Sequence, residues 1–159
     1  MHSVRVICLG ASGIGKTDML QTMARSELVY GSVSTIGVDI VTLHAQNMNV
    51  RIWDTGGRPE FESMLNAFKR DSQVTLLCYS DGDIASFEWA KEKQIEGEFI
   101  VINLSKTNMS VANSLMHNAS CLGGIVYTPR TWTTARAQLL ALLRPVCTEE
   151  HQRCGCTML

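Results

Sequence analysis

A glycine-rich stretch near the start of the chain has the residue types and spacing of a phosphate-binding loop. Residues 10–17 read GASGIGKT and fill the pattern G-x-x-x-x-G-K-[ST]. Glycines let backbone N–H groups curl around phosphate oxygens, lysine adds a positive charge for the outer phosphates, and the threonine hydroxyl can bind Mg²⁺. The alternative is a glycine-rich turn that binds nothing. The predicted phosphate contacts are Ser12, Gly13, Ile14, Gly15, Lys16, Thr17 and Asp18.

A phosphate-binding loop of this kind joins a buried strand to a helix, and the sequence predicts both on either side of it. VRVICLG (4–10) is a short apolar run rich in β-branched residues that ends at glycine, as a buried parallel strand does. Residues 16–26 place Met19, Leu20 and Met23 at helical spacing. A helix that begins inside the loop presents its positive end to the same anion.

The rest of the apolar pattern predicts an α/β fold. Residues 38–54 alternate and break near Gln46 and Asn47, which predicts two antiparallel strands joined by a tight turn. Strands alternating with helices imply a parallel sheet covered by helices on both faces. The prediction is a six-stranded, mostly parallel sheet with one antiparallel strand. Its further strands are predicted at 74–80, 98–105 and 123–129, and its further helices at 85–94, 107–119 and 131–144.

Length and composition set limits on what the chain does. The 159 residues fit one domain, and we expect it at residues 1–145, followed by a short flexible tail at 146–159. The net charge of −1 provides no basic field for a polyanion, so nucleic acid is not an expected partner. The first ten residues have no signal-peptide pattern and no apolar run could span a bilayer, so we expect a cytosolic chain whose membrane contact comes from an anchor.

In two further motifs the sequence resembles the small GTPases, most closely the Rab branch of the Ras superfamily. They are STIGVDI at 34–40 and WDTGG at 53–57. The family's counterparts are TIGVD in the first switch and WDTAGQE in the second. The resemblance implies a P-loop NTPase fold of the small-G-protein type, with GTP or GDP and Mg²⁺ as ligands. It also implies that Thr35 reaches Mg²⁺ and the γ-phosphate, that Asp54 holds Mg²⁺ through water, and that the Gly57 amide senses the γ-phosphate.

The second switch departs from the family at the residue that orients the attacking water. The family has glutamine there, and this chain has Arg58, which cannot accept a hydrogen bond. The expected catalytic set is therefore Arg58, Thr35 and Lys16, with slow intrinsic hydrolysis. Arg58 is either a charge that stabilises the transition state or a simple loss of the catalytic residue. Activating proteins in the family can supply both an arginine and a glutamine, so stimulated hydrolysis stays open.

The base pocket is a second departure. The family's N-K-x-D motif aligns with Asn103 to Lys106, which puts a cationic donor where guanine needs a carboxylate acceptor. The family's S-A-K motif aligns with Thr128 and Pro129, and proline lacks the backbone N–H that binds the guanine carbonyl. Guanine selectivity should therefore weaken. A shifted alignment, in which Asn108 or Ser105 takes part, stays open.

The last six residues, CGCTML, end in the C-a-a-X form of a prenylation signal. Cys156 is the expected lipid site, with Cys154 as a second, because one chain alone gives marginal membrane binding. Two free thiols are the alternative. With this anchor we expect the protein at the cytoplasmic face of an intracellular membrane, with a cytosolic pool.

These motifs predict a Rab-like nucleotide switch in vesicle or membrane traffic. The resemblance implies that effector proteins, an exchange factor and an activating protein bind through residues 30–69. The rival hypothesis is a pseudo-GTPase, a binding module that keeps the fold and the effector face without a working nucleotide cycle. A phosphate-loop kinase of small molecules is a third possibility, but TIGVD and WDTGG have no role in one.

Overall fold

The computed structural model describes residues 2–154, with side chains described as far as Cys147. Its centre is a six-stranded sheet in the order β2-β3-β1-β4-β5-β6. β2 runs antiparallel to β3, and every other neighbouring pair is parallel, which confirms the predicted fold. The strands are β1 (His2–Gly10), β2 (Val38–Ala45), β3 (Met48–Thr55), β4 (Val74–Tyr79), β5 (Glu98–Leu104) and β6 (Cys121–Tyr127).

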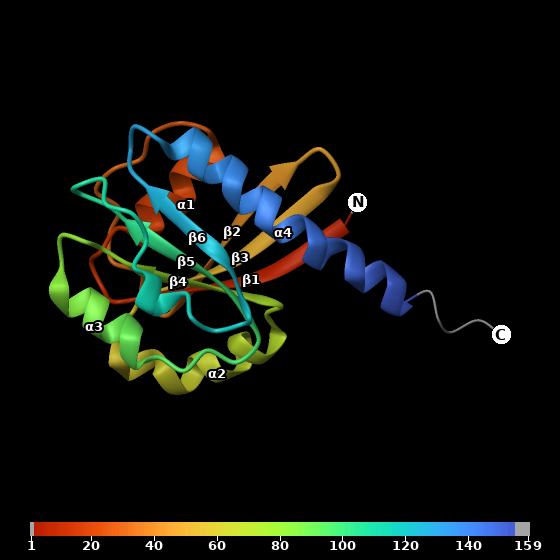
Figure 1. Cartoon of the computed structure of the whole chain (residues 1–159), viewed down its shortest axis with the longest axis horizontal. Coiled ribbons are helices and arrows are strands. Elements are labelled where there is room, and N and C mark those ends of the chain that lie inside the picture. Colours follow the sequence, from red (N-terminus) through yellow and green to blue (C-terminus); the bar gives the residue numbers. More distant parts are fainter. Residues whose placement is uncertain (1, 155–159) are drawn as a thin grey trace.

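Helices cover both faces of the sheet. Figure 1 shows α1 (Lys16–Arg25) and α4 (Trp132–Cys154) on one face, and α2 (Glu62–Asp71) and α3 (Ile84–Glu92) on the other. Two short 3₁₀ turns, η1 (Pro59–Phe61) and η2 (Asn113–Leu115), complete the described elements. Because β1, β4 and β5 are parallel, their carboxyl ends meet at one edge of the sheet, where doubly wound folds place their ligands.

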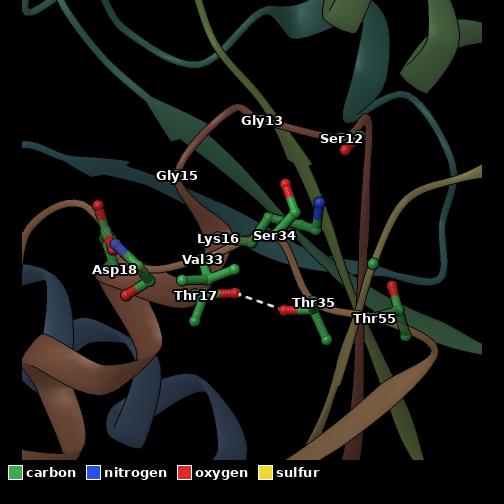
Figure 2. Close-up of a pocket in the computed structure, with 12 residues that line it drawn as sticks. Ser12, Gly13, Gly15, Lys16, Thr17, Asp18, Val33, Ser34, Thr35 and Thr55 are labelled. Carbon is green, nitrogen blue, oxygen red and sulfur yellow. Dashed lines mark hydrogen bonds between the residues drawn. The ribbon is translucent and has the colours of Figure 1, made fainter.

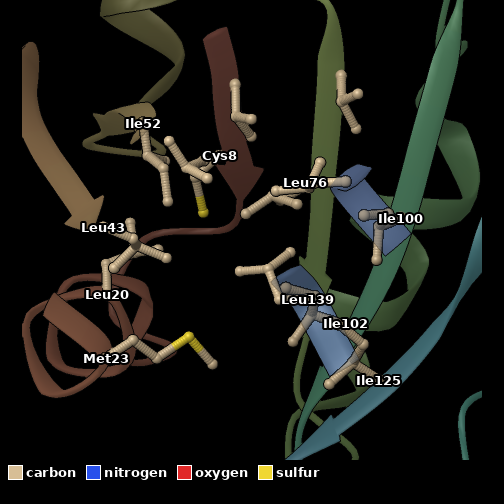
Figure 3. Close-up of a cluster of buried hydrophobic side chains, with 14 of the residues drawn as sticks. Cys8, Leu20, Met23, Leu43, Ile52, Leu76, Ile100, Ile102, Ile125 and Leu139 are labelled. Atoms are coloured by element: carbon tan, nitrogen blue, oxygen red, sulfur yellow. The ribbon is translucent and has the colours of Figure 1, made fainter. Parts of the chain in front are cut away.

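The larger core lies between the sheet and the α1/α4 layer. Leu20 and Met23 of α1 and Leu139 of α4 are fully buried against strand side chains such as Leu76 and Ile102 (Figure 3). The apolar spacing in the sequence predicted this face of α1 correctly. Burial of these side chains fixes the helix against the sheet, and so it fixes the position of the phosphate loop that joins β1 to α1.

The connection from β5 to β6 differs from the prediction. A helix was expected at 107–119, but the structure has only η2 there, so that prediction is wrong. Asn108 adopts a left-handed conformation with φ 59°, which interrupts a helix. The N–H groups of Lys106 and Met109 are hydrogen-bonded to the side chain of Asp81 and not to a helical turn. Local polar groups compete with the helix here and win.

Two helices also differ from the prediction, one in where it ends and one in not having been predicted. The helix predicted to end at residue 144 continues to Cys154 with Pro145 inside it, so the expected end was wrong. Val146 and Cys147 beyond the proline are buried, and this burial offsets the cost of a proline within a helix, about 3 kcal/mol. α2 was not predicted, although Leu65 and Phe68 have helical spacing.

Among the described residues no helix has both the length and the apolarity that a membrane span requires.

Candidate functional site

The phosphate loop is held open by two glycines in left-handed conformations. Gly13 has φ 79°, and Gly15, which caps the N-terminus of α1, has φ 99°. A side chain at either position would be strained. The loop borders a polar pocket, and the first switch loop (residues 26–37) borders it from the other side (Figure 2). The lining residues are Ser12, Gly13, Gly15, Lys16, Thr17, Asp18, Ser32, Val33, Ser34, Thr35, Thr55 and Gly56.

Lys16 is buried in the loop, and its amine is held by the loop backbone. Its Nζ donates to the carbonyl oxygens of Gly10 at 2.9 Å and Ala11 at 2.7 Å. The side chain is only 5% exposed, so its positive charge is concentrated in a partly desolvated setting. A buried ammonium at the N-terminal end of α1 is suited to binding an anion.

The three residues predicted to ligate a metal lie together. The Thr17 hydroxyl is 2.9 Å from the Thr35 hydroxyl, the contact dashed in Figure 2. The Thr17 and Thr35 hydroxyls also lie 2.6 and 3.3 Å from Asp54 Oδ2. These residues come from α1, the first switch loop and β3, and the parallel pairing of β1 with β3 brings them together. The arrangement is a small cluster of oxygen donors at the mouth of the phosphate loop.

The Asp54 carboxylate has one oxygen that the protein does not satisfy. Asp54 is 1% exposed, and among the described residues its Oδ1 has no hydrogen-bond partner. Burial raises the pKa of this carboxyl, although hydrogen bonds from Thr17 and Thr35 and the charge of Lys16 act in the opposite direction. A buried, unpaired acceptor is costly. Its presence beside two hydroxyls fits a hard cation such as Mg²⁺, which prefers oxygen ligands.

Gly56 and Gly57 are packed between the two loops that border the pocket. A Cβ at Gly57 would overlap the backbone of Gly10 and Ser12, and one at Gly56 would overlap the carbonyl oxygen of Thr35. The Gly56 N–H donates to the carbonyl of Gly37 at 3.0 Å. The structure therefore places the Gly57 backbone against the phosphate loop, and the glycine pair allows the first switch loop to approach closely.

Arg58, the predicted catalytic residue, lies outside this pocket. Its guanidinium is 3.7 Å from the Glu60 carboxylate, and both side chains are exposed. It borders a separate hollow between α2 and α3 that includes Trp89 and Lys93. The structure thus brings Lys16 and Thr35 together but leaves Arg58 apart from them.

Two of the residues predicted to contact a base, Asn103 and Lys106, are hydrogen-bonded to Asp81, a residue that the sequence analysis did not single out. Asn103 is fully buried, donates from Nδ2 to Asp81 Oδ2 at 3.2 Å, and accepts the Asp81 N–H at 3.1 Å. The hydroxyls of Ser105 and Thr107 donate to Asp81 Oδ2, the latter at 3.0 Å. Lys106 N–H donates to Oδ1 at 2.8 Å. This set, together with Met109 N–H, is called the Asp81 network below.

The Asp81 network lowers the pKa of the Asp81 carboxyl. Burial raises the pKa of the Asp81 carboxyl, but hydrogen bonds from Ser105, Lys106, Thr107 and Asn103 outweigh it and hold the pKa well below its usual range. One signal could have found Asp81. Asp81 comes two residues after the end of the buried apolar run 74–79, and the carboxyl ends of such strands are where parallel sheets place their site residues. In the structure β4 pairs with β5, so that Tyr79 lies opposite Asn103.

The other residues predicted to contact the nucleotide base also have contacts within the chain. The Lys106 side chain packs against Gly82, where a Cβ would lie 2.8 Å from Lys106 Cδ. Thr128 and Thr131 share hydrogen bonds of 2.9 to 3.5 Å around Pro129, just before α4 begins. Within the described part of the chain, neither Asn103 and Lys106 nor Thr128 and Pro129 line the phosphate pocket.

Comparison with known families agrees with this geometry. The family model Roc, described as the Ras of Complex domain of DAPkinase, matches residues 5–109, more than half of the chain. The chain is a Rab-like small GTPase of the Ras superfamily. This family membership confirms the resemblance drawn from TIGVD and WDTGG.

Relatives of this Rab-like GTPase include Rab and Ypt proteins. Mouse Ras-related protein Rab-37 is 35% identical over 89 residues, which cover 53% of this chain and 40% of the relative. Arabidopsis thaliana RABA2b is 28% identical over 119 residues, covering 70% of this chain and 56% of the relative. Chlamydomonas reinhardtii YPTC6 is 30% identical over 114 residues, which cover 67% of this chain and 53% of the relative. The chain thus spans about half the length of the curated relatives that it matches.

The side chains of the two predicted lipid sites lie outside the part of the chain whose side chains the structure describes. Cys156 lies outside the described residues, and Cys154 is the last residue of α4, with its side chain outside the described ones. Lipid attachment at both therefore stays a prediction from the sequence.

Proposed function

We propose that this Rab-like GTPase is a guanine-nucleotide switch that binds GTP and GDP with Mg²⁺ and hydrolyses GTP slowly. The observation that supports it best is the convergence of Thr17, Thr35 and Asp54 beside the phosphate loop, with one Asp54 oxygen unpaired. A loop that contributes a ligand to such a cluster responds to the terminal phosphate and its metal, which is how nucleotide switches work.

Each residue of the phosphate end has a distinct task in this proposal. The backbone N–H groups of the loop and the Lys16 ammonium bind the phosphates. Thr17 and Thr35 hold Mg²⁺ through their hydroxyls, and the Asp54 carboxylate holds it through water. Mg²⁺, when bound, neutralises charge on the phosphates. The Gly57 backbone packs against the phosphate loop, and in this proposal its N–H senses the outermost phosphate.

Slow hydrolysis follows from the position and chemistry of Arg58. A guanidinium cannot accept a hydrogen bond from water, so it does not orient the nucleophile as glutamine would. Its guanidinium lies 3.7 Å from the Glu60 carboxylate, and Arg58 is not among the residues that line the phosphate pocket. Of the two interpretations of Arg58, this geometry favours loss of the catalytic residue over stabilisation of the transition state in the same chain.

Exposed apolar side chains of the first switch loop and β2 support partner binding at residues 30–69. Val33 is 87% exposed, Ile36 81% and Ile40 54%, and Met64 of α2 is also exposed. Met64 adjoins the first switch loop, since its Cε would lie 3.2 Å from a Cβ at Gly37. Adjoining exposed apolar side chains are typical of interaction sites. We propose that effectors and regulators bind this surface, and that lipid on Cys156 and Cys154 anchors the protein to a membrane in vesicle traffic. Mass spectrometry of the protein isolated from cells tests the lipids.

The rival function is a pseudo-GTPase, and the Asp81 network is the observation in its favour. The loop that would select guanine has its Asn103 amide and its Ser105 and Thr107 hydroxyls bonded to Asp81. A module of this kind would bind partners without regard to nucleotide.

Calorimetric titration of nucleotide-free protein with GTP, GDP, ATP and ADP, with and without Mg²⁺, separates the two functions. We expect guanine nucleotides to bind tightly and Mg²⁺ to increase their affinity. Binding of none of the four would refute the switch and favour the pseudo-GTPase.

A single-turnover assay of Arg58→Gln tests slow hydrolysis. We expect GTP hydrolysis to accelerate by about tenfold or more, because glutamine can orient the attacking water. Arg70→Gln, on the outer end of α2, is the matched control and should leave the rate unchanged. Faster hydrolysis by the wild type than by Arg58→Gln would show that Arg58 itself promotes the reaction.

A further inference from the structure

A hollow of about 380 Å³ lies beside the start of α3. The end of β4, the first turn of α3 and residues 109–113 form its walls, and it is called the α3 hollow below. Its volume is that of a cleft that holds a small molecule or a few side chains. In the described part of the chain it shares no lining residue with the phosphate pocket, so the two are separate sites.

Apolar side chains form part of the wall of the α3 hollow. Ile84, the first residue of α3, is 79% exposed, and Met109 on the facing loop is 62% exposed. Phe87 lies one turn further along α3, on the same side as Ile84, and packs edge-on against Tyr79 with ring centroids 5.5 Å apart. An apolar side chain that entered between Ile84 and Met109 would lose contact with water on several sides. Adjoining exposed apolar side chains of this kind mark interaction sites.

A carboxylate with spare acceptor capacity borders the same hollow. Asp83 caps the N-terminus of α3, where its Oδ1 accepts the Ser86 N–H at 3.3 Å. Among the described residues Asp83 has no ion pair. A carboxylate can accept several hydrogen bonds, so one long bond leaves it able to pair with a cation.

A buried hydroxyl without a partner is a second, independent sign of a ligand. Ser80 lines the α3 hollow and is 1% exposed, and among the described residues its Oγ has no hydrogen-bond partner. The backbone of Ser80 is satisfied, because its N–H and its carbonyl are both bonded to the Ser86 hydroxyl, at 2.9 and 3.3 Å. An unpaired buried hydroxyl is costly, and a polar group that entered the hollow would remove that cost.

The charges around the α3 hollow favour a cation. Asp81 and Asp83 both border it, and the low pKa of Asp81 keeps that carboxyl ionised. Lys106 is the opposing charge, since its side chain packs over the glycine between them. Lys91, further along α3, pairs with Glu88 at 3.1 Å, so that pair adds no net charge. Two carboxylates against one ammonium leave the hollow with a negative balance.

We propose that the α3 hollow binds a basic, partly apolar segment of a partner protein. In this complex an arginine or lysine pairs with Asp83, and an apolar neighbour fills the space between Ile84 and Met109. An arginine has five donors, enough to serve the Ser80 hydroxyl as well. The first turn of α3 lies at the end of the molecule opposite the last turns of α4 (Figure 1), which favours a protein over a membrane bound near the end of α4. The hollow is distinct from residues 30–69, so this partner binds in addition to the effectors proposed above.

An array of short random peptides, probed with the labelled full chain, tests the chemistry of the partner. We expect the bound peptides to carry arginine or lysine next to leucine, isoleucine or methionine. Enrichment of acidic peptides, or an array with no peptide bound, would overturn the proposal. Binding to vesicles of phosphatidylserine and phosphatidylcholine without binding to any peptide would point to a membrane and overturn it too. The peptide that binds best is then the probe, and fluorescence anisotropy measures its affinity.

Single substitutions separate the charge of the hollow from its apolar wall. Asp83→Asn removes the charge but keeps an acceptor that can cap α3, and affinity for the peptide should fall by about tenfold. Ile84→Ser should also weaken binding by about tenfold, because it removes an apolar anchor. Glu92→Gln, at the other end of α3, is the control for the first variant, and Ile36→Ser, at an isoleucine that is 81% exposed, is the control for the second. Both controls should change affinity by less than about twofold. A loss in Ile36→Ser as large as in Ile84→Ser would place the peptide on the first switch loop and overturn the proposal.

Salt and nucleotide give two readouts that a merely structural role would not change. Raising KCl from about 50 to about 500 mM should weaken peptide binding by about threefold or more in wild type and by less in Asp83→Asn, because salt screens the ion pair. The peptide should bind equally with GDP and with a non-hydrolysable GTP analogue. Equal salt dependence in the two proteins, or binding in one nucleotide state alone, would contradict the proposal. Failure of either nucleotide to bind would defeat the proposed function instead, and the peptide measurements would still decide the α3 hollow.

Discussion

The phosphate end and the base end of the candidate site lie at the same edge of one sheet but differ in which polar groups face a pocket and in one unpaired acceptor. At the phosphate end, Lys16, Thr17 and Thr35 line a pocket and Asp54 keeps an unpaired oxygen beside it. At the base end, the side chain of Asn103 and the N–H of Lys106 are bonded to Asp81. Lys16, Thr17 and Thr35 have partners in the chain as well, but they border an open pocket, whereas the groups bonded to Asp81 do not line it.

This difference teaches where nucleotide affinity should come from. Polar atoms already paired inside the protein must lose that pairing before they can bind a base, which cancels much of the gain. The phosphate end has no such cost at Asp54. We therefore expect binding to depend strongly on the phosphates and weakly on the identity of the base.

The largest expected effect comes from breaking the phosphate end. Lys16→Ala should weaken Mg–GDP binding by at least about 100-fold, because it removes a partly desolvated positive charge that lines the phosphate pocket. Calorimetry measures the change, with Lys91→Ala, an exposed lysine paired with Glu88, as the control. A loss below tenfold would show that the phosphate end does not dominate affinity.

Breaking the base end should affect stability more than binding. Asp81→Ala leaves the donors of the Asp81 network without their acceptor, so the free energy of unfolding should fall by about 2–3 kcal/mol. Urea titration measures it, and GDP affinity should change by less than about threefold. If Asp81→Ala instead lost GDP binding as fully as Lys16→Ala, the base end would be part of the ligand site.

A carboxylate placed at position 106 sharpens the comparison further. Lys106→Asp restores the acceptor that guanine's ring N–H and amino group need, so preference for GDP over ADP should rise by about tenfold. Competition binding measures the ratio, and Lys106→Ala separates the new acceptor from loss of the cation. An unchanged preference in both variants would mean that the base does not reach this loop.

The smallest effect is the pH dependence of the Asp81 network. Because hydrogen bonds lower the pKa of Asp81 in the folded state, its contribution to stability is present above the unfolded value near 4 and is lost as pH falls below it. The stability difference between wild type and Asp81→Ala should shrink by about 0.5 kcal/mol between pH 6 and pH 3.5. Urea titrations across this range measure it. A difference that grew on acidification would contradict the ionised network.

What the sequence determined by itself was local. The phosphate loop, the hairpin with its turn at Gln46 and Asn47, and the buried strands were all predictable, since periodicity and turn chemistry act between residues close in the chain. Thr35 and Asp54 came from motif resemblance, and the structure places them beside Thr17.

Only the tertiary structure decided what long-range hydrogen bonds do. Asp81 meets Ser105 and Lys106 because β4 pairs with β5, and that contact replaces the helix expected at 107–119. Asp18 binds Gly31 and Ser32 because the loop folds back over α1. In both places a carboxylate takes backbone donors from a segment distant in sequence. A pattern of neighbours cannot predict this, because the outcome depends on which acceptor the fold brings within reach.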